Sequence, residues 1–273
     1  MENFIKDYIT SLKNPKIKNI IHLQKANERK EQNLFIIEGL REIQKAANSD
    51  YEFYSIFFCK DIINSKSVKL FIEKFNCNDI FEVSRDVYEK IAYRENTEGI
   101  VVLAKPKNHS FKNINVNENP LVLVLEGVEK PGNIGAILRT ADAAGINSVI
   151  ICNEKFDLYN PNVIRSSIGC LFTVPIVVCN NETAIKWLKS NEISIYCTYL
   201  GSSEPYFKVD FSKPSAIVMG TEATGITDIW LKAATQNIII PMYGQADSMN
   251  VSTSTAVVVF EACRQRFLEK SLL

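Results

Sequence analysis

Three stretches of the chain place glycines and polar side chains directly after a short apolar run, where they could bind a ligand. In the first, residues 126–142, Pro131 and Gly132 turn the chain and Asn133 can cap the helix that follows. Arg139 lies about one and a half turns into that helix. Two interpretations of Arg139 stay open at this point: a substrate contact, or a surface salt bridge with Asp142 three residues on.

The second stretch, residues 218–226, brackets an acid with two glycines. Gly220 and Gly225 allow the backbone to wrap closely around a ligand, while Glu222 supplies a carboxylate. The alternative is a plain glycine-rich turn in which water solvates Glu222.

The third stretch, residues 240–254, runs into an apolar helix expected over 255–266. Ser248 and Asn250 stand where a helix N-terminus leaves amide donors unpaired. They are therefore either ligand contacts or helix caps.

The elements that position these stretches form an α/β pattern. Apolar runs with helical patterns between most of them predict a parallel sheet covered by helices; the runs are 121–125, 148–152, 172–178, 193–197, 216–219 and 237–240. In such sheets ligands bind at the carboxyl ends of the strands. We therefore expect the three stretches to meet.

The N-terminal part reads as a smaller α/β unit. Strands are expected at 34–38, 51–59, 80–83 and 99–104, with helices up to Asn48, over 68–75 and from Ser84 to Ile91. From Lys105 to Pro120 the composition shifts to Pro, Asn, Lys and Ser with few apolar residues, which predicts a linker at 107–119. The expected domains are 1–106 and 120–273.

Basic residues concentrate near the N-terminus, although the whole chain carries 31 Lys and Arg against 31 Asp and Glu. Residues 13–30 contain six basic side chains and one acid, a net charge of +5. They form either the solvated face of an amphipathic helix, with Ile17, Ile20, Ile21 and Leu23 turned inward, or a surface that contacts phosphates.

Composition excludes several classes of protein. The 273 residues are 46% hydrophobic and 23% charged, which is typical of packed domains and not of disordered chains. Seven cysteines without a C-x-x-C pair indicate buried thiols in a reducing cytosol, and two isolated histidines, His22 and His109, offer no metal site. No run is long enough to span a membrane, so we expect a cytoplasmic protein.

Taken together, the three stretches carry N-x-G-x-x-x-R-T-A, M-G-x-E-x-x-G and I-P-M-x-G-x-x-x-S-M-N-V-S in that order. This combination resembles the SpoU-type ribose 2'-O-methyltransferases of the SPOUT class. The resemblance covers residues 120–273 and includes the small-residue segment 163–169. The N-terminal part resembles the family's substrate-binding domain, except that Asn96 and Glu98 stand where Pro and Gln are usual.

The resemblance implies an α/β methyltransferase domain with a deep trefoil knot, a smaller RNA-binding α/β domain and a homodimer. It implies S-adenosylmethionine as methyl donor, with these residues lining its pocket: Thr198, Met219, Gly220, Ile240, Met242 and Met249. It makes Arg139 the catalytic residue, with Asn133, Glu222, Ser248 and Asn250 fixing the site. A guanidinium is essentially never neutral, so we favour a role in holding the ribose phosphate and stabilising the developing alkoxide over proton removal.

The expected substrate is 23S ribosomal RNA, because family members with the extra N-terminal domain resemble ribosomal enzymes more than tRNA enzymes. We expect RNA contacts from six basic residues, namely Lys13, Lys16, Lys18, Arg29, Arg41 and Arg165. Alternatives are a tRNA 2'-O-methyltransferase and a non-catalytic RNA-binding or ribosome-assembly factor. A nicotinamide-dependent oxidoreductase is less favoured, because no strand leads into G-x-G-x-x-G.

Overall fold

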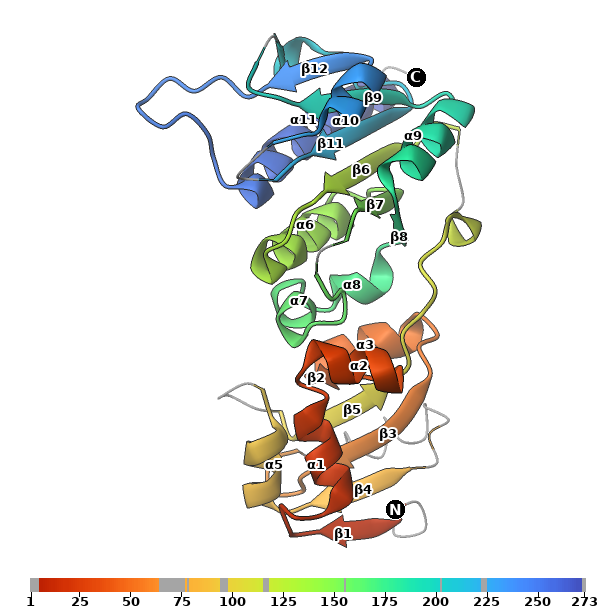
Figure 1. Ribbon diagram of the computed structural model, residues 1–273, viewed down its shortest axis with the longest axis vertical. Coiled ribbons are helices and arrows are strands. Elements are labelled where there is room, and N and C mark those ends of the chain that lie inside the picture. Colours follow the sequence, from red (N-terminus) through yellow and green to blue (C-terminus); the bar gives the residue numbers. More distant parts are fainter. Residues whose placement is uncertain are drawn as a thin grey trace. The chain divides into compact units, whose positions relative to one another are not determined.

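The protein divides into two compact units in the computed structural model (Figure 1). The structure describes residues 5–63, 77, 79–93, 98–114, 118–154, 156–201, 203–221 and 225–271. The first unit comprises 1–108 together with 157–173, and the second comprises 109–156 and 174–273. Residues 157–173 thus join the first unit although they follow the expected linker, and the division into domains at 107–119 stays a prediction.

The first unit is built on a mixed sheet with the order β1-β4-β3-β5-β2, in which β5 runs antiparallel to β3 and β2. Its strands are β1 (Asp7–Ile9), β2 (Phe35–Glu38), β3 (Phe53–Phe58), β4 (Ile80–Val83) and β5 (Ile100–Ala104). Its helices are α1 (Pro15–His22), α2 (Ala26–Gln32), α3 (Leu40–Asn48), α5 (Arg85–Ile91), α7 (Pro161–Ser166) and α8 (Cys170–Thr173). The helix expected over 68–75 lies outside the described residues.

The basic segment forms two short helices, α1 and α2, where the sequence predicted one. Asn14 caps α1 by accepting the Lys16 N–H at 2.9 Å, and the chain breaks helical geometry between His22 and Ala26. Ile17 and Ile20 are buried in the core under the sheet, as expected for the inward face.

An aromatic cluster and an ion pair fix residues 157–173 within the first unit. The ring centroids of Phe35 and Tyr159 lie 4.2 Å apart, and Phe172 packs on Phe35 and Tyr51. Arg29, which is 5% exposed, binds the Asp157 carboxylate at 2.5 Å and donates to the Leu23 carbonyl at 2.7 Å. The Arg29 guanidinium is therefore buried and occupied by contacts within the protein. We revise the expectation that Arg29 contacts RNA.

The second unit contains a sheet with the order β10-β12-β9-β11-β6-β7-β8, and every strand pair in it is parallel, as predicted. Its strands are β6 (Leu121–Glu126), β7 (Ser148–Cys152), β8 (Ile176–Cys179), β9 (Ser194–Thr198), β10 (Glu204–Pro205), β11 (Ser215–Met219) and β12 (Gln236–Ile239). Its helices are α6 (Pro131–Ala143), α9 (Asn181–Ser190), α10 (Asp228–Ala233) and α11 (Val251–Ser271), with short 3-10 turns η2 (Phe111–Asn113) and η3 (Tyr206–Lys208). The apolar run 172–178 is not one strand, because its start belongs to α8.

Alternate residues of these strands face two different layers of helices. Val122, Val124 and Val218 join a core cluster with Leu188 of α9 and Trp230 of α10. The intervening strand residues point to the opposite face, where α11 contacts β11 and α6. In the described part of the chain, no helix combines the length and the hydropathy needed to cross a membrane.

Candidate active site

A cavity of about 710 Å³ lies where three neighbouring parallel strands end. β9 ends at Thr198, β11 at Met219 and β12 at Ile239, and in Figure 1 the arrowheads of β11 and β12 point toward the loop that joins β12 to α11. The lining residues are Lys130, Thr198, Tyr199, Leu200, Met219, Gly220, Thr221, Gly225, Ile238, Ile239, Ile240, Met242, Asp247, Ser248, Met249, Asn250, Val251 and Ser254. This volume suits a small organic ligand.

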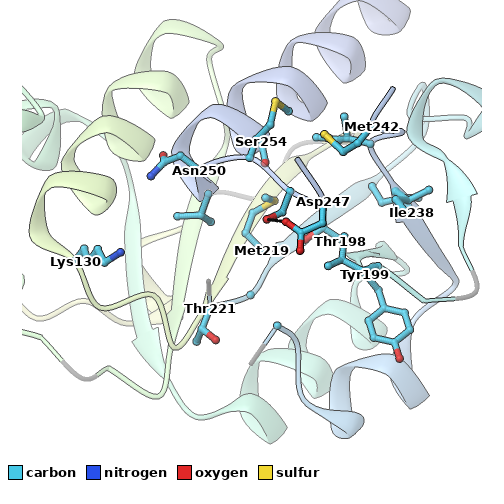
Figure 2. Close-up of a pocket in the computed structure, with 18 residues that line it drawn as sticks. Lys130, Thr198, Tyr199, Met219, Thr221, Ile238, Met242, Asp247, Asn250 and Ser254 are labelled. Carbon is cyan, nitrogen blue, oxygen red and sulfur yellow. Dashed lines mark hydrogen bonds between the residues drawn. The ribbon is translucent and has the colours of Figure 1, made fainter. Parts of the chain in front are cut away.

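All six residues expected to line a methyl-donor pocket line this cavity: Thr198, Met219, Gly220, Ile240, Met242 and Met249. Figure 2 shows the side chains of Met219, Thr198 and Asp247 close together, with Met242 and Ile238 to one side. The Thr198 hydroxyl donates to the Val218 carbonyl at 2.9 Å, so this side chain ties β9 to β11. Burial raises the pKa of the neighbouring Cys197 thiol to about 12, which makes it a poor nucleophile.

The second glycine-bearing stretch brings Thr221 and Gly225 together in the cavity wall. Thr221 and Gly225 exchange two backbone hydrogen bonds of 3.1 Å. A Cβ atom on Gly220 would stand only 2.5 Å from the Gly225 carbonyl carbon, so the turn requires glycine at this position. The predicted site acid, Glu222, lies outside the described residues.

The third stretch meets the first through a pair of asparagines. Asn250 caps α11 by accepting from the Ser252 N–H at 3.0 Å and from its hydroxyl at 2.6 Å. Its amide also donates to Asn133 Oδ1 at 3.1 Å. The ligand and cap interpretations of Asn250 are therefore compatible. Ser248 lines the cavity and donates to Asp247 at 3.2 Å.

The first stretch approaches the cavity only at its start. Lys130 lines the cavity and occupies the N-cap position of α6 without a side-chain capping bond. Asn133, predicted as the cap, instead lies in the first turn, because Pro131 begins the helix. Arg139 is exposed on α6, about 9 Å further along the helix axis than Asn133, and is not among the lining residues.

Sequence reasoning missed several lining residues, notably Lys130, Tyr199, Thr221, Ile238 and Asp247. Tyr199 and Thr221 stand two residues after predicted apolar runs and Ile238 lies within one, so a position near a strand terminus was the available signal for these three. Within the described residues, no group of three or more His, Cys, Asp and Glu could hold a metal ion.

The remaining basic residues expected to contact RNA lie in the first unit. Lys13, Lys16 and Lys18 are exposed on or beside α1, and Lys16 stands 4.7 Å from the centroid of the Phe81 ring. Arg41 and Arg165 are also exposed. Glu98, which departs from the family pattern, accepts the backbone N–H of Leu40 at the start of α3, so it has a structural role there.

A parallel α/β unit with a ligand cavity at the carboxyl ends of adjacent strands defines a small-molecule-binding α/β domain. The chain belongs to the SpoU rRNA methylase family, whose model matches residues 120–260. A second model, the MRM3-like substrate binding domain, matches residues 14–102. The family resemblance and the α/β fold with an N-terminal substrate-binding domain are thus confirmed, while the knot stays a prediction.

Relatives and solved structures cover nearly the whole chain. The 23S rRNA (guanosine(2553)-2'-O)-methyltransferase RlmP of Bacillus subtilis is 28% identical over 92% of this chain and 97% of its own length. The 23S rRNA (guanosine-2'-O-)-methyltransferase RlmB of Vibrio parahaemolyticus is 32% identical over 70% of this chain and 80% of its own. The AdoMet-bound rRNA methyltransferase structure from Sinorhizobium meliloti is 30% identical with a TM-score of 0.87, covering 94% of this chain and 97% of that one.

The contacts of Gly220 generate a prediction about the cavity wall. Gly220→Ala should lower the free energy of unfolding by about 1–3 kcal/mol, because the added methyl group overlaps the Gly225 backbone. Urea unfolding followed by fluorescence measures this change. Gly132→Ala is the matched control, since a Cβ there meets nothing within 4 Å. Equal stability of the two variants would contradict the described turn.

Proposed function

We propose that the protein is an RNA methyltransferase that transfers a methyl group from S-adenosylmethionine to a ribose 2'-hydroxyl of 23S rRNA, in the cytoplasm. The observation that carries this proposal is a cavity lined by residues of the second and third family motifs, with Asn133 of the first motif hydrogen-bonded to the cavity-lining Asn250. The names of the relatives support ribosomal RNA as the substrate. The match to a substrate-binding domain over residues 14–102 adds a second region for holding RNA.

The cavity suits S-adenosylmethionine in size and in chemistry. Met219, Ile238 and Met242 offer apolar surfaces for an adenine ring, and the backbone of 238–240 and of the Gly220 turn offers polar groups to its edge. The bound donor supplies a methyl group on a positively charged sulfur. Asp247, the acidic residue among the lining side chains of the described chain, provides a negative charge beside it.

We assign the handling of the RNA ribose to the side of the cavity nearest α6. Asn250 and Asn133 form one hydrogen-bonded pair there, and Lys130 lies beside them. They orient the sugar so that its hydroxyl is in line with the methyl group. Arg139, exposed on the same helix, holds the ribose phosphate and stabilises the negative charge that develops on the attacking oxygen. Ser248 and Glu222 complete the proposed site.

We further propose that the protein is a homodimer formed through α11. Phe260 and Phe267 are 50% and 71% exposed, and their spacing of seven residues places them on one face of the helix. A second copy of the chain would remove this apolar face from water.

Arg139→Ala should lower the rate of methyl transfer about a hundredfold or more, because it removes the charge that stabilises the attacking oxygen. Binding of S-adenosylmethionine, measured by calorimetry, should change less than twofold, since Arg139 does not line the cavity. Transfer of labelled methyl groups to 23S rRNA transcripts gives the rate, and Arg139→Lys, which keeps the charge, should be intermediate. Full activity of the alanine variant removes Arg139 from the proposed mechanism.

Replacing Lys13, Lys16 and Lys18 together with Ala should weaken RNA binding and flatten its salt dependence. The slope of log K against log salt should shrink by about one for each phosphate group that the variant no longer binds. Filter binding from low to high salt measures it. The matched control replaces Lys186, Lys189 and Lys208, three exposed lysines of the second unit. If both triple variants behave alike, the α1 surface does not bind RNA.

Phe260→Asp combined with Phe267→Asp should convert the dimer to a monomer, because each new carboxylate would be buried against apolar surface. Light scattering after size exclusion reports the mass. Phe207→Asp, at a site 49% exposed on η3, should leave the dimer intact. If the double variant stays dimeric, the α11 interface is ruled out.

A further inference from the structure

Glu126, which no motif above singles out, is a buried acid beneath the wall of the cavity. It ends β6 with 3% of its surface exposed. Its carboxylate accepts three hydrogen bonds: from Asn181 Nδ2 at 2.7 Å, from the Thr227 N–H at 2.9 Å and from the Thr227 hydroxyl at 2.5 Å. Asn181 in turn accepts the indole N–H of Trp230 at 2.9 Å.

Glu126 cannot touch a ligand in the cavity. Val122, Val124 and Glu126 alternate along β6, so Glu126 shares the sheet face covered by α9 and α10. Met219 alternates with Val218 on β11 and points to the other face, where the cavity lies. Any effect of Glu126 on a ligand must therefore act through the backbone between the two faces.

Through Thr227, Glu126 binds the chain just after Gly225, which lies in the cavity wall. Thr227 follows the Thr221 to Gly225 turn by two residues, and both of its donors point at Glu126. The Thr227 side chain makes no capping bond to α10, although Thr227 is the N-cap residue of that helix. Its hydroxyl therefore binds Glu126 and does not cap the N-terminus of α10.

The residue after Glu126 leaves room for Thr221 to approach the end of β6. Gly127 has a φ of +63°, and a Cβ there would stand 2.9 Å from the Thr221 side-chain methyl. β6 also pairs directly with β11, with Leu125 beside Met219. Glu126 therefore binds the chain at Thr227, while Gly127 allows Thr221 to lie close to the end of β6.

We propose that Glu126 is a positioning residue for the methyl-donor pocket: by binding Thr227 it fixes the nearby cavity-lining Gly225 and, through the backbone bonds between Gly225 and Thr221, the cavity-lining Gly220, in the arrangement that receives the donor. This inference rests on the proposed function, because the donor is S-adenosylmethionine. An ordered cavity wall lowers the conformational entropy that is lost when the donor binds. Glu126 therefore acts on the affinity of the pocket for the donor. Chemistry at saturating donor is unaffected by Glu126.

Glu126→Gln tests the proposal because the glutamine amide cannot accept all three of the hydrogen bonds that the Glu126 carboxylate accepts. Either orientation of the amide places its NH₂ group against another donor, at Thr227 or at Asn181. The dissociation constant for S-adenosylmethionine, measured by calorimetry on the full-length protein, should rise about tenfold. KM for the donor should rise in parallel, while kcat at saturating donor stays within twofold of the wild-type value.

Thr227 supplies a matched pair of variants that keep Glu126. Thr227→Val removes the hydroxyl donor and should weaken donor binding about threefold, whereas Thr227→Ser retains the donor and should stay within twofold. Trp230→Phe breaks the far end of the network. It should lower the thermal midpoint of unfolding yet leave donor affinity within twofold, which a purely structural role of the network would not predict.

The outcomes separate the two proposals. Wild-type protein that fails to bind S-adenosylmethionine overturns the proposed function and this inference together. Normal wild-type binding with an unchanged dissociation constant in Glu126→Gln overturns this inference alone, as does a loss of affinity in Trp230→Phe that equals the loss in Glu126→Gln. If Glu126→Gln does not fold, equal affinities of Thr227→Val and Thr227→Ser overturn it.

Discussion

The parallel pairing of β12, β9 and β11 is the constraint on which the site depends. Parallel strands bring their carboxyl ends to one edge, so Thr198, Met219 and Ile239 reach the same place although 41 residues of sequence, from 198 to 239, separate them. Each strand then releases a loop at that edge, and the loops enclose the cavity. An antiparallel neighbour would send one of these loops to the opposite end of the sheet and leave the cavity without a wall.

Hydrogen bonds made by side chains hold these loops in place where they meet. The Asn250 to Asn133 bond joins the start of α11 to the start of α6, and the Glu126 to Thr227 bonds hold the glycine turn from the other face of the sheet. Glu126 is buried, and a buried charge is costly when it is left unpaired. The second unit therefore specifies its cavity by satisfying these groups as well as by packing its strands.

The alternation of apolar runs and helical patterns was sufficient to predict the parallel sheet and the edge at which ligand loops meet, because strand termini and ligand loops coincide in this architecture. The six lining residues were predicted from the resemblance to the SpoU family. Three features were not predictable. The run 172–178 is apolar in both its helical and its strand half, so periodicity could not divide it. Arg29 looks like a surface cation in sequence, and only its Asp157 partner, 128 residues away, buries it. Glu126 reads as the polar end of an apolar run, and its partners at 181 and 227 are visible only in the fold.

The central claim, that the cavity at the ends of β9, β11 and β12 receives the methyl donor, is most directly tested by methionine methyl NMR. The chain has four methionines, of which Met219, Met242 and Met249 line the cavity and Met1 lies outside the described residues. With ¹³C-methyl methionine in the protein, saturating S-adenosylmethionine should shift the three cavity resonances. Binding of the donor without any shift of the Met219, Met242 and Met249 signals would contradict the account.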